Sequence, residues 1–225
     1  MSLKTLLVVM CLVLTVAFLS CVDVPSNAPE FPDFRTQTRF IQASASLGAA
    51  SVTVDGVSAA SVDYQSASAY MDIAAGNRLM LVGGDAVATS LALEADGKIT
   101  VVIFPKDSPT AARFRKFTER RTYDALPDTV GQVRFISAGL DTAGGSGSYD
   151  VVNMADSSVV VPAMALRDNS GYLNMPAGSY TFGMAPAGTE NFLATVDITL
   201  ANGQRFTAII FGDQTSAAMR GFQDD

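Results

Sequence analysis

Hydrophobic and polar residues alternate over short stretches along most of the chain after residue 21. In the stretch QTRFIQAS at 37–44, Phe40 lies on one face of a predicted strand, and Arg39, Ile41 and Ala43 lie on the other. Turn residues recur about every 8 to 12 positions, and no convincing helical period is present. This pattern predicts an all-β protein built as an antiparallel sandwich or barrel.

The same stretch returns as QVRFISA at 132–138, so the chain is predicted to be a tandem repeat. We assign a first β-sandwich to residues 37–125 and a second to 130–225. Each unit has about 90 residues, a size at which a single core can fold alone with a modest margin. Residues 126–129, LPDT, form the predicted hinge between two sandwiches in series.

Turn signals occupy matching places in the two copies. Asp55-Gly56 follows an alternating strand and predicts a tight hairpin. Asp96-Gly97 and Asn202-Gly203 suit a type I′ turn, so each predicts a closing hairpin that leads into an apolar strand. These apolar strands, 99–104 and 208–211, are expected at the centre of a sheet, buried on both faces.

Two further strands lead into glycine-bearing turns. The strand at 70–73 is followed by Gly76 and a return strand at 78–82. The second copy answers with 172–175, a turn at Gly178 and a return strand at 179–184.

The amino end has the features of an export signal. Lys4 precedes an apolar run over residues 6–19, which is shorter than the roughly 20 residues of a membrane span. The segment FLSC at 18–21 resembles the bacterial lipobox, which implies a signal peptide over 1–20 and acylation of Cys21, with palmitate among the usual acyl chains. The alternative is an ordinary cleaved signal with an incidental cysteine.

Prolines at 25, 29 and 32 indicate that residues 21–36 form an extended tether between the lipid and the first domain. Val22 follows the cysteine where some bacteria use aspartate to retain a lipoprotein, and this favours sorting to the outer membrane. The expected partner is therefore a membrane, reached through the lipid anchor. Nucleic acid is not expected, because the net charge is -7.

Composition removes several kinds of catalysis. Histidine is absent, and Cys11 and Cys21 are the only cysteines, the first of them inside the predicted signal. Histidine-dependent triads and zinc sites of histidine and cysteine are thereby excluded. We predict no enzyme activity, no cofactor and no metal site.

The remaining candidate residues each have a plain structural interpretation as well. A glycosidase would need two facing carboxylates, whereas these acids are scattered singly along the chain. The glycine- and serine-rich segment 141–150 could wrap calcium, but it lacks the Asp-x-Asp spacing of a dedicated loop and is better explained as a hairpin tip. The scattered acids are Asp55, Asp63, Asp72, Asp150, Asp156 and Asp197.

The basic segment 113–121 is either a partner-binding patch or, as charge runs usually are, a solvated face or a protected edge strand. Five tyrosines could offer platforms for a sugar, although the recurrence of Tyr70 and Tyr172 in the two copies favours packing. The parts that differ between the copies, namely this segment and the 141–156 insertion, are where individual function is expected. The tyrosines are Tyr64, Tyr70, Tyr149, Tyr172 and Tyr180.

These strand and turn motifs together resemble the bacterial domain of unknown function 4397 (DUF4397). The resemblance covers about 37–107 and 132–213, and it departs from the pattern where YDVVNMAD at 149–156 replaces the Val-Asp-Gly hairpin. It implies an immunoglobulin-like β-sandwich in an exported, surface-attached protein, and it brings no catalytic residues. The expected function is a non-catalytic envelope lipoprotein with a structural, adhesive or accessory binding role. The alternative is a carbohydrate-binding surface lipoprotein that delivers glycans to an uptake or degradation system.

Overall fold

The computed structural model describes residues 33–83, 85, 88–106, 113–121, 129–140 and 147–224, with the side chains at 120 and 121 left aside. The chain divides into two units, Met1–Asp33 and Phe34–Asp225, and both repeats lie in the second. The predicted signal peptide, Cys21, most of the tether, the hinge up to residue 128 and the segment 141–146 lie outside the described residues. Within the described part, no helix has the length and apolar character needed to cross a membrane.

Within the described residues, each repeat contributes eight strands, and a short 3-10 turn, Ala45–Leu47, follows the first strand. The strands of the first repeat are β1 (Arg35–Gln42), β2 (Ala50–Val54), β3 (Val57–Val62), β4 (Met71–Ala74), β5 (Gly76–Val82), β6 (Thr89–Leu93), β7 (Gly97–Ile103) and β8 (Phe114–Arg121). Those of the second are β9 (Gly131–Ser137), β10 (Ser148–Asn153), β11 (Ser158–Ala165), β12 (Leu173–Met175), β13 (Gly178–Pro186), β14 (Ala194–Leu200), β15 (Arg205–Phe211) and β16 (Ala218–Gln223).

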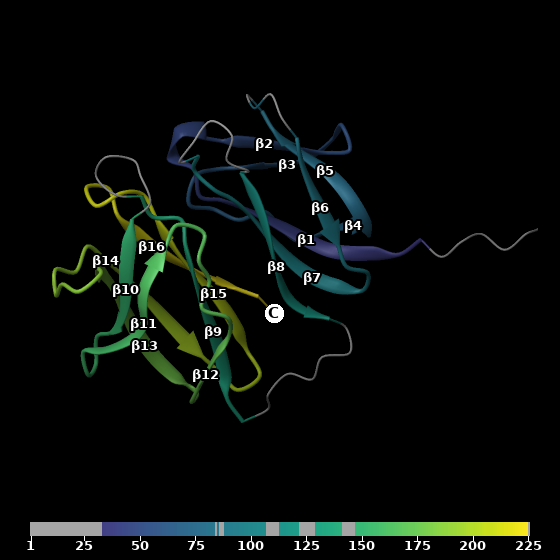
Figure 1. Ribbon diagram of the computed structural model, residues 1–225. Helices are drawn as coiled ribbons and strands as arrows, with labels where there is room; N and C mark the ends of the chain where they lie inside the picture. The colour runs from purple at the N-terminus through teal and green to yellow at the C-terminus, as the bar shows by residue number, and fades with distance from the viewer. Residues whose placement is uncertain are drawn as a thin grey trace, which may run out of the picture. The chain divides into compact units, whose positions relative to one another are not determined.

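The strands form four sheets of four strands each (Figure 1). In the first repeat the orders are β4-β1-β7-β8 and β3-β2-β5-β6, and in the second they are β12-β9-β15-β16 and β11-β10-β13-β14. Each repeat is therefore a β-sandwich of the same topology, as predicted. One feature differs from a purely antiparallel sandwich: β1 pairs with β7, and β9 with β15, in parallel.

The predicted closing hairpins are wrong in their pairing. The turns at Asp96 and Gly203 do adopt positive φ, 54° and 76°. However, β6 and β7 belong to different sheets, and so do β14 and β15, so each turn carries the chain across the sandwich. The return strands β5 and β13 likewise lie in the sheet opposite to β4 and β12. A tight turn reverses the chain but does not determine which strand the next strand pairs with. Because β7 and β15 are apolar on both faces, they are stable at the centre of the other sheet, where both faces are buried.

The Asp55-Gly56 hairpin is confirmed, since β2 pairs with β3 and both turn residues have positive φ. In the second repeat, β10 and β11 form the corresponding hairpin around Met154–Ser157 in place of the two-residue turn. The first strand begins at Arg35, so the last two residues assigned to the tether are instead paired with β4. No proline follows residue 32 there, and the backbone donors are free to join the sheet.

Three apolar clusters set the order of the layers. One cluster fills the first sandwich around Phe40, and a second fills the other sandwich around Phe135. A third cluster joins the repeats, with Ile41 and Val102 from one and Ile209 from the other. The predicted alternation in β1 is thus confirmed: Phe40 faces its own core, while the opposite face packs against the second repeat. The sheet containing β1 and the sheet containing β9 are therefore the inner layers of a four-layer assembly.

Candidate functional site

Beside the third apolar cluster, the two inner sheets bury a set of polar side chains, which we call the inter-repeat network. The repeats supply related members, since in each of them an arginine in the first strand lies opposite a threonine in the seventh. The members from the first repeat are Arg39, Tyr70, Lys98, Thr100 and Glu119. Those from the second are Arg134, Tyr172, Arg205, Thr207 and Asp224.

Arg39 has a full set of partners in this network. Its Nε donates to Thr100 Oγ1 at 2.8 Å, and its Nη1 donates to the carbonyl oxygen of Gln223 at 2.7 Å. Its Nη2 donates to the Asp224 carboxylate and lies 3.1 Å from Glu119 Oε1. The side chain is 4% exposed and both carboxylates are fully covered, so this is a buried ion pair between the repeats.

The two recurrent tyrosines belong to the same network. Tyr70 donates its hydroxyl to Glu119, and Tyr172 donates to Asp224 Oδ2 at 2.6 Å. The guanidinium carbon of Arg39 lies 5.0 Å from the ring centre of Tyr70, and that of Arg134 lies 4.8 Å from the ring centre of Tyr172. Their recurrence therefore reflects a shared place in the fold, as the packing interpretation predicted.

Burial governs the titration of these groups. Desolvation raises the pKa of Glu119 above its usual value, and the neighbouring charge of Asp224 raises it further, although Arg39 opposes both. Desolvation also raises the pKa of the Tyr70 and Tyr172 phenols, so both stay protonated as hydrogen-bond donors at neutral pH. Most members of the network are thus satisfied by one another inside the molecule.

The approximate symmetry fails at Arg134. Its Nε donates to Thr207 Oγ1 at 2.8 Å and its Nη1 to the carbonyl oxygen of Thr118 at 3.2 Å, as in Arg39. Its Nη2, however, makes no hydrogen bond within the described part of the chain and lies 3.8 Å from Glu119 Oε1. The side chain is only 3% exposed. Arg134 is therefore a buried cation with incomplete partners.

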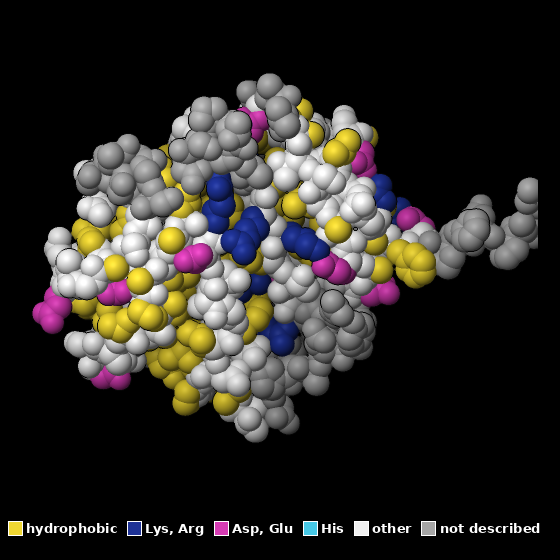
Figure 2. Space-filling view, in the orientation of Figure 1, with side chains coloured by type: hydrophobic (Ala, Val, Ile, Leu, Met, Phe, Trp, Pro, Cys, Tyr) yellow, Lys and Arg dark blue, Asp and Glu magenta, His cyan; other side chains and the backbone are white. Residues whose placement is uncertain are grey.

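A surface hollow of about 270 Å³ opens beside Arg134. One wall comes from β8 of the first repeat, and the other comes from β9 and the residues before β12 in the second. Figure 2 shows Lys and Arg side chains gathered over the middle of this face, where β8 lies in Figure 1. The lining residues are Arg115, Lys116, Phe117, Thr118, Arg134, Asn169, Gly171 and Tyr172. We call this hollow the inter-repeat groove.

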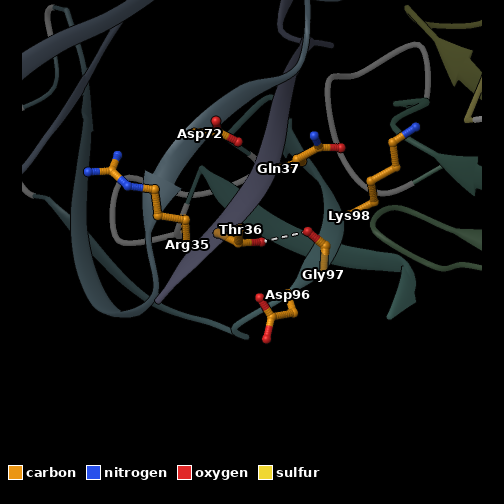
Figure 3. A pocket seen from close by; sticks show the side chains of 7 residues that line it. All are labelled: Arg35, Thr36, Gln37, Asp72, Asp96, Gly97 and Lys98. Atoms are coloured by element: carbon orange, nitrogen blue, oxygen red, sulfur yellow. Dashed lines mark hydrogen bonds between the residues drawn. The ribbon is translucent and has the colours of Figure 1, made fainter. Parts of the chain in front are cut away.

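A larger hollow, of about 350 Å³, lies at one end of β1 and β7 in the first repeat (Figure 3). Thr36 Oγ1 donates to the carbonyl oxygen of Gly97 at 3.0 Å across it. Charges of both signs surround it, and the tyrosines do not line it. Its lining residues are Arg35, Thr36, Gln37, Asp72, Asp96, Gly97 and Lys98.

The acids singled out in the sequence have separate structural places. Asp55 pairs with Arg78 at 3.0 Å, Asp156 accepts from Ser158, and Asp197 accepts from Thr181. Asp150 is buried and accepts from two backbone N–H groups, of Ala163 and Gly188. Asp63 and Asp72 are exposed. Within the described residues, no group of three or more His, Cys, Asp or Glu side chains is placed to hold a metal ion.

The remaining tyrosines from the predicted set pack against aromatic rings or are buried. Tyr64 meets Phe211 edge to face, Tyr149 is fully buried, and Tyr180 stacks on Phe182. Tyr172 is the tyrosine from the predicted set that reaches the inter-repeat groove.

The described part of the basic segment 113–121 consists mainly of the edge strand β8. Arg113 pairs with Asp85 at 2.6 Å, and Lys116 pairs with Glu94. Phe117 and Glu119 point inward and are buried. This agrees with the protected edge strand of the two interpretations, while Arg115 and Lys116 also border the groove.

Glu119 and Asp224 are members of the inter-repeat network that sequence reasoning missed. They lie far from Arg39 in the chain, and neither belongs to a recognisable motif. A signal was nevertheless present, because Arg39 and Arg134 occur on the same strand face as apolar residues. A charge on such a face requires a buried partner of opposite sign.

Solved structures of low sequence identity align with most of the chain. No curated protein matches the chain. A solved structure described as "Alpha-glucan binding by a streptococcal virulence factor" is 13% identical, with a TM-score of 0.25, and the alignment covers 82% of this chain and 95% of that one. A leucine-rich repeat protein from Bacteroides thetaiotaomicron is 14% identical, with a TM-score of 0.19, covering 80% of this chain and 26% of that one. Neither TM-score indicates a shared arrangement.

The second repeat carries the family resemblance. Residues 131–225 match the family model described as a domain of unknown function, DUF4397. The match begins with β9 and runs to the end of the second sandwich. The predicted resemblance to DUF4397 is thereby confirmed over the second copy.

Proposed function

We propose that the protein is an exported, lipid-anchored module of the cell envelope whose two sandwiches form one rigid body with a non-catalytic binding or structural role. The observation that carries this proposal is the interface between the repeats. Its apolar cluster and its buried ion pairs join the two inner sheets over their length. A rigid pair of domains on a tether presents a fixed surface to partners at low entropic cost.

The anchor in this proposal is Cys21. Two or more acyl chains would hold the protein stably to one membrane leaflet, because each buried methylene contributes about 0.8 kcal/mol. Val22, in place of an aspartate after the cysteine, favours sorting to the outer membrane. The partners on this proposal are the membrane itself and an envelope component bound by the folded part.

Intact-mass spectrometry of the protein from its native membrane tests the anchor. The expected mass is that of a chain beginning at Cys21 with acyl groups attached, and a Cys21→Ala variant should be released in soluble form. A chain cleaved elsewhere and secreted without lipid would overturn the anchored module.

A second candidate role is carbohydrate binding at the cell surface, in which the protein delivers glycans to an uptake or degradation system. The inter-repeat groove favours it, because a half-buried tyrosine, an amide and a threonine hydroxyl border the hollow. Such groups can pair with sugar hydroxyls. Binding of oligosaccharides to the whole exported chain, measured by calorimetry, tests this role.

A further inference from the structure

The inter-repeat groove contains a cation that lacks the partner which its counterpart has. At Arg39, two carboxylates approach the same guanidinium nitrogen. At Arg134, the equivalent nitrogen has only the 3.8 Å contact with Glu119. The two repeats thus place an arginine at the same position of the fold, and Arg39 has its full set of partners whereas Arg134 does not.

The charge balance of the buried network agrees with this difference. Three of its arginines, Arg39, Arg134 and Arg205, are less than 9% exposed. Among the described residues, the carboxylates buried with them in the network are Glu119 and Asp224. Even with both carboxylates ionised, the set carries an excess positive charge, and a buried charge without a partner is costly. An anion that reached Arg134 would reduce this cost.

The Arg134 side chain lines the groove, so an anion bound there would lie beside its guanidinium, although Nη2 itself is buried before any ligand arrives. Two aromatic rings lie close to its guanidinium, whose carbon atom is 5.6 Å from the ring centre of Phe117 and 4.8 Å from that of Tyr172. Two fixed hydrogen bonds from Nε and Nη1 also orient it. The free Nη2 is therefore held in place before any ligand arrives, which lowers the entropic cost of binding.

The rim of the groove indicates what carries the anion. Arg115 is exposed there and adds a second positive charge. Asn169 uses its Oδ1 to accept from Gly171 at 2.8 Å, while its side-chain N–H groups have no partner among the described residues. With the Thr118 hydroxyl, they suit a hydroxylated ligand. The hollow, of about 270 Å³, is slightly smaller than the ligand pockets of about 300 to 1,000 Å³ that are usual in proteins, so a small ligand suits it.

We propose that the inter-repeat groove binds the carboxylate of an acidic saccharide, a uronic-acid unit, with Arg134 as the anchoring cation and with Arg115, Asn169 and Thr118 at the rim. The carboxylate would take at Arg134 the place that an internal carboxylate takes at Arg39, as a charge-assisted hydrogen bond. This inference rests on the carbohydrate-binding role proposed above and names its ligand class.

Calorimetric titration of the whole exported chain with trigalacturonate tests the proposal. The matched control is the fully methyl-esterified trisaccharide, which has the same skeleton without the charges. We expect the ester to bind at least about tenfold more weakly than the acid, because it loses one charge-assisted hydrogen bond. Equal binding of acid and ester would overturn the proposal, as would binding of inorganic sulfate without binding of trigalacturonate.

Variants identify the site. Arg134→Gln should abolish binding, but this side chain also orders Thr207 and Thr118, so unfolding of the variant is followed in parallel. Asn169→Ala and Arg115→Ala change exposed side chains and should each weaken binding about two- to tenfold. Arg220→Ala, an exposed arginine of β16 outside the groove, should leave binding unchanged. Undiminished binding in Asn169→Ala and Arg115→Ala would place the ligand elsewhere and overturn the assignment.

Failure of this site is distinguishable from failure of the proposed function. Acylation of Cys21 is measured by mass, and the rigidity of the repeats is measured by hydrogen exchange, both without ligand. A protein that is acylated and rigid but does not bind trigalacturonate would overturn the saccharide site alone.

Discussion

At the scale of single residues, the molecule depends on buried charges that satisfy one another. Arg39 holds two carboxylates, from Glu119 and Asp224, and each carboxylate also accepts from a tyrosine. Such an arrangement adds little net stability compared with an apolar core, but it is expensive to break. Its value lies in specifying how the two sheets meet.

Replacement of Arg39 by glutamine should therefore be severely destabilising. It leaves the Asp224 and Glu119 carboxylates buried without their main cation, and we expect a loss of about 3 to 5 kcal/mol in the free energy of unfolding. Urea denaturation measures the loss. Arg220→Gln, at an exposed position, should change the free energy by less than about 0.5 kcal/mol. A loss below about 1 kcal/mol in Arg39→Gln would contradict the role given to the ion pair.

The raised pKa of Glu119 predicts a pH dependence of stability. A carboxyl whose pKa is higher in the folded state keeps its proton to a higher pH in that state than in the unfolded chain. Its contribution is complete below the unfolded pKa, near 4.5, and is lost as the pH rises through the folded value. We expect the urea midpoint to fall over this window in the native protein and to fall less in Glu119→Gln. An identical pH profile in the two proteins would show that Glu119 does not titrate in this way.

The phenols of Tyr70 and Tyr172 should ionise last among the six tyrosines, because burial raises the pKa of both. Ultraviolet difference absorbance at alkaline pH measures their ionisation. The signal that develops before unfolding should be the same in Tyr70→Phe and Tyr172→Phe as in the native protein. A reduced early signal in either variant would mean that the substituted phenol is accessible to hydroxide.

At the scale of elements, sequence patterns predicted the strands and most turns but not the sheets. The alternation in β1 predicted both of its faces correctly, because period-two geometry is local. The turns at Asp96-Gly97 and Asn202-Gly203 were also placed correctly, yet they connect different sheets. Which sheet receives β7 is decided by burial on both of its faces, and one of those faces is covered by the other repeat. That information is not local.

For the same reason, the partner of Arg39 could not be read from the sequence. Glu119 is 80 residues away and Asp224 is 185 residues away, and tertiary packing alone brings them together. Likewise, the groove at Arg134 is formed by β8, which ends the first repeat, and by residues before β12 in the second. The prediction of two sandwiches in series did not include a surface shared by both repeats.

A substitution of Ile41 tests whether a residue of β1 stabilises the packing between the two repeats. Its side chain is fully buried in the cluster between the inner sheets. Ile41→Ala should cost about 2 to 5 kcal/mol in unfolding free energy, the range for large-to-small changes in a core. Leu79→Ala in β5, where the leucine is 55% exposed, should be nearly neutral. If the two substitutions had similar small effects in urea denaturation, the packing between the sheets would be weaker than the buried contacts indicate.

At the scale of the whole molecule, residues 34–225 form one compact unit although they contain two copies of one fold. The outer faces of the two inner sheets pack against each other, and this explains why β7 and β15 are buried on both sides. The central claim is that the repeats are a single cooperative body with the inter-repeat groove as its shared surface.

Hydrogen exchange with mass-spectrometric detection tests this claim most directly. Amides of β7 in the first repeat and β15 in the second are followed in the native protein and in Arg39→Gln. The account predicts that the opening free energies of both strands fall together in the variant, because loss of the shared network destabilises one cooperative unit. Loss of protection in β7 with unchanged protection in β15 would contradict it, since the repeats would then be independent domains.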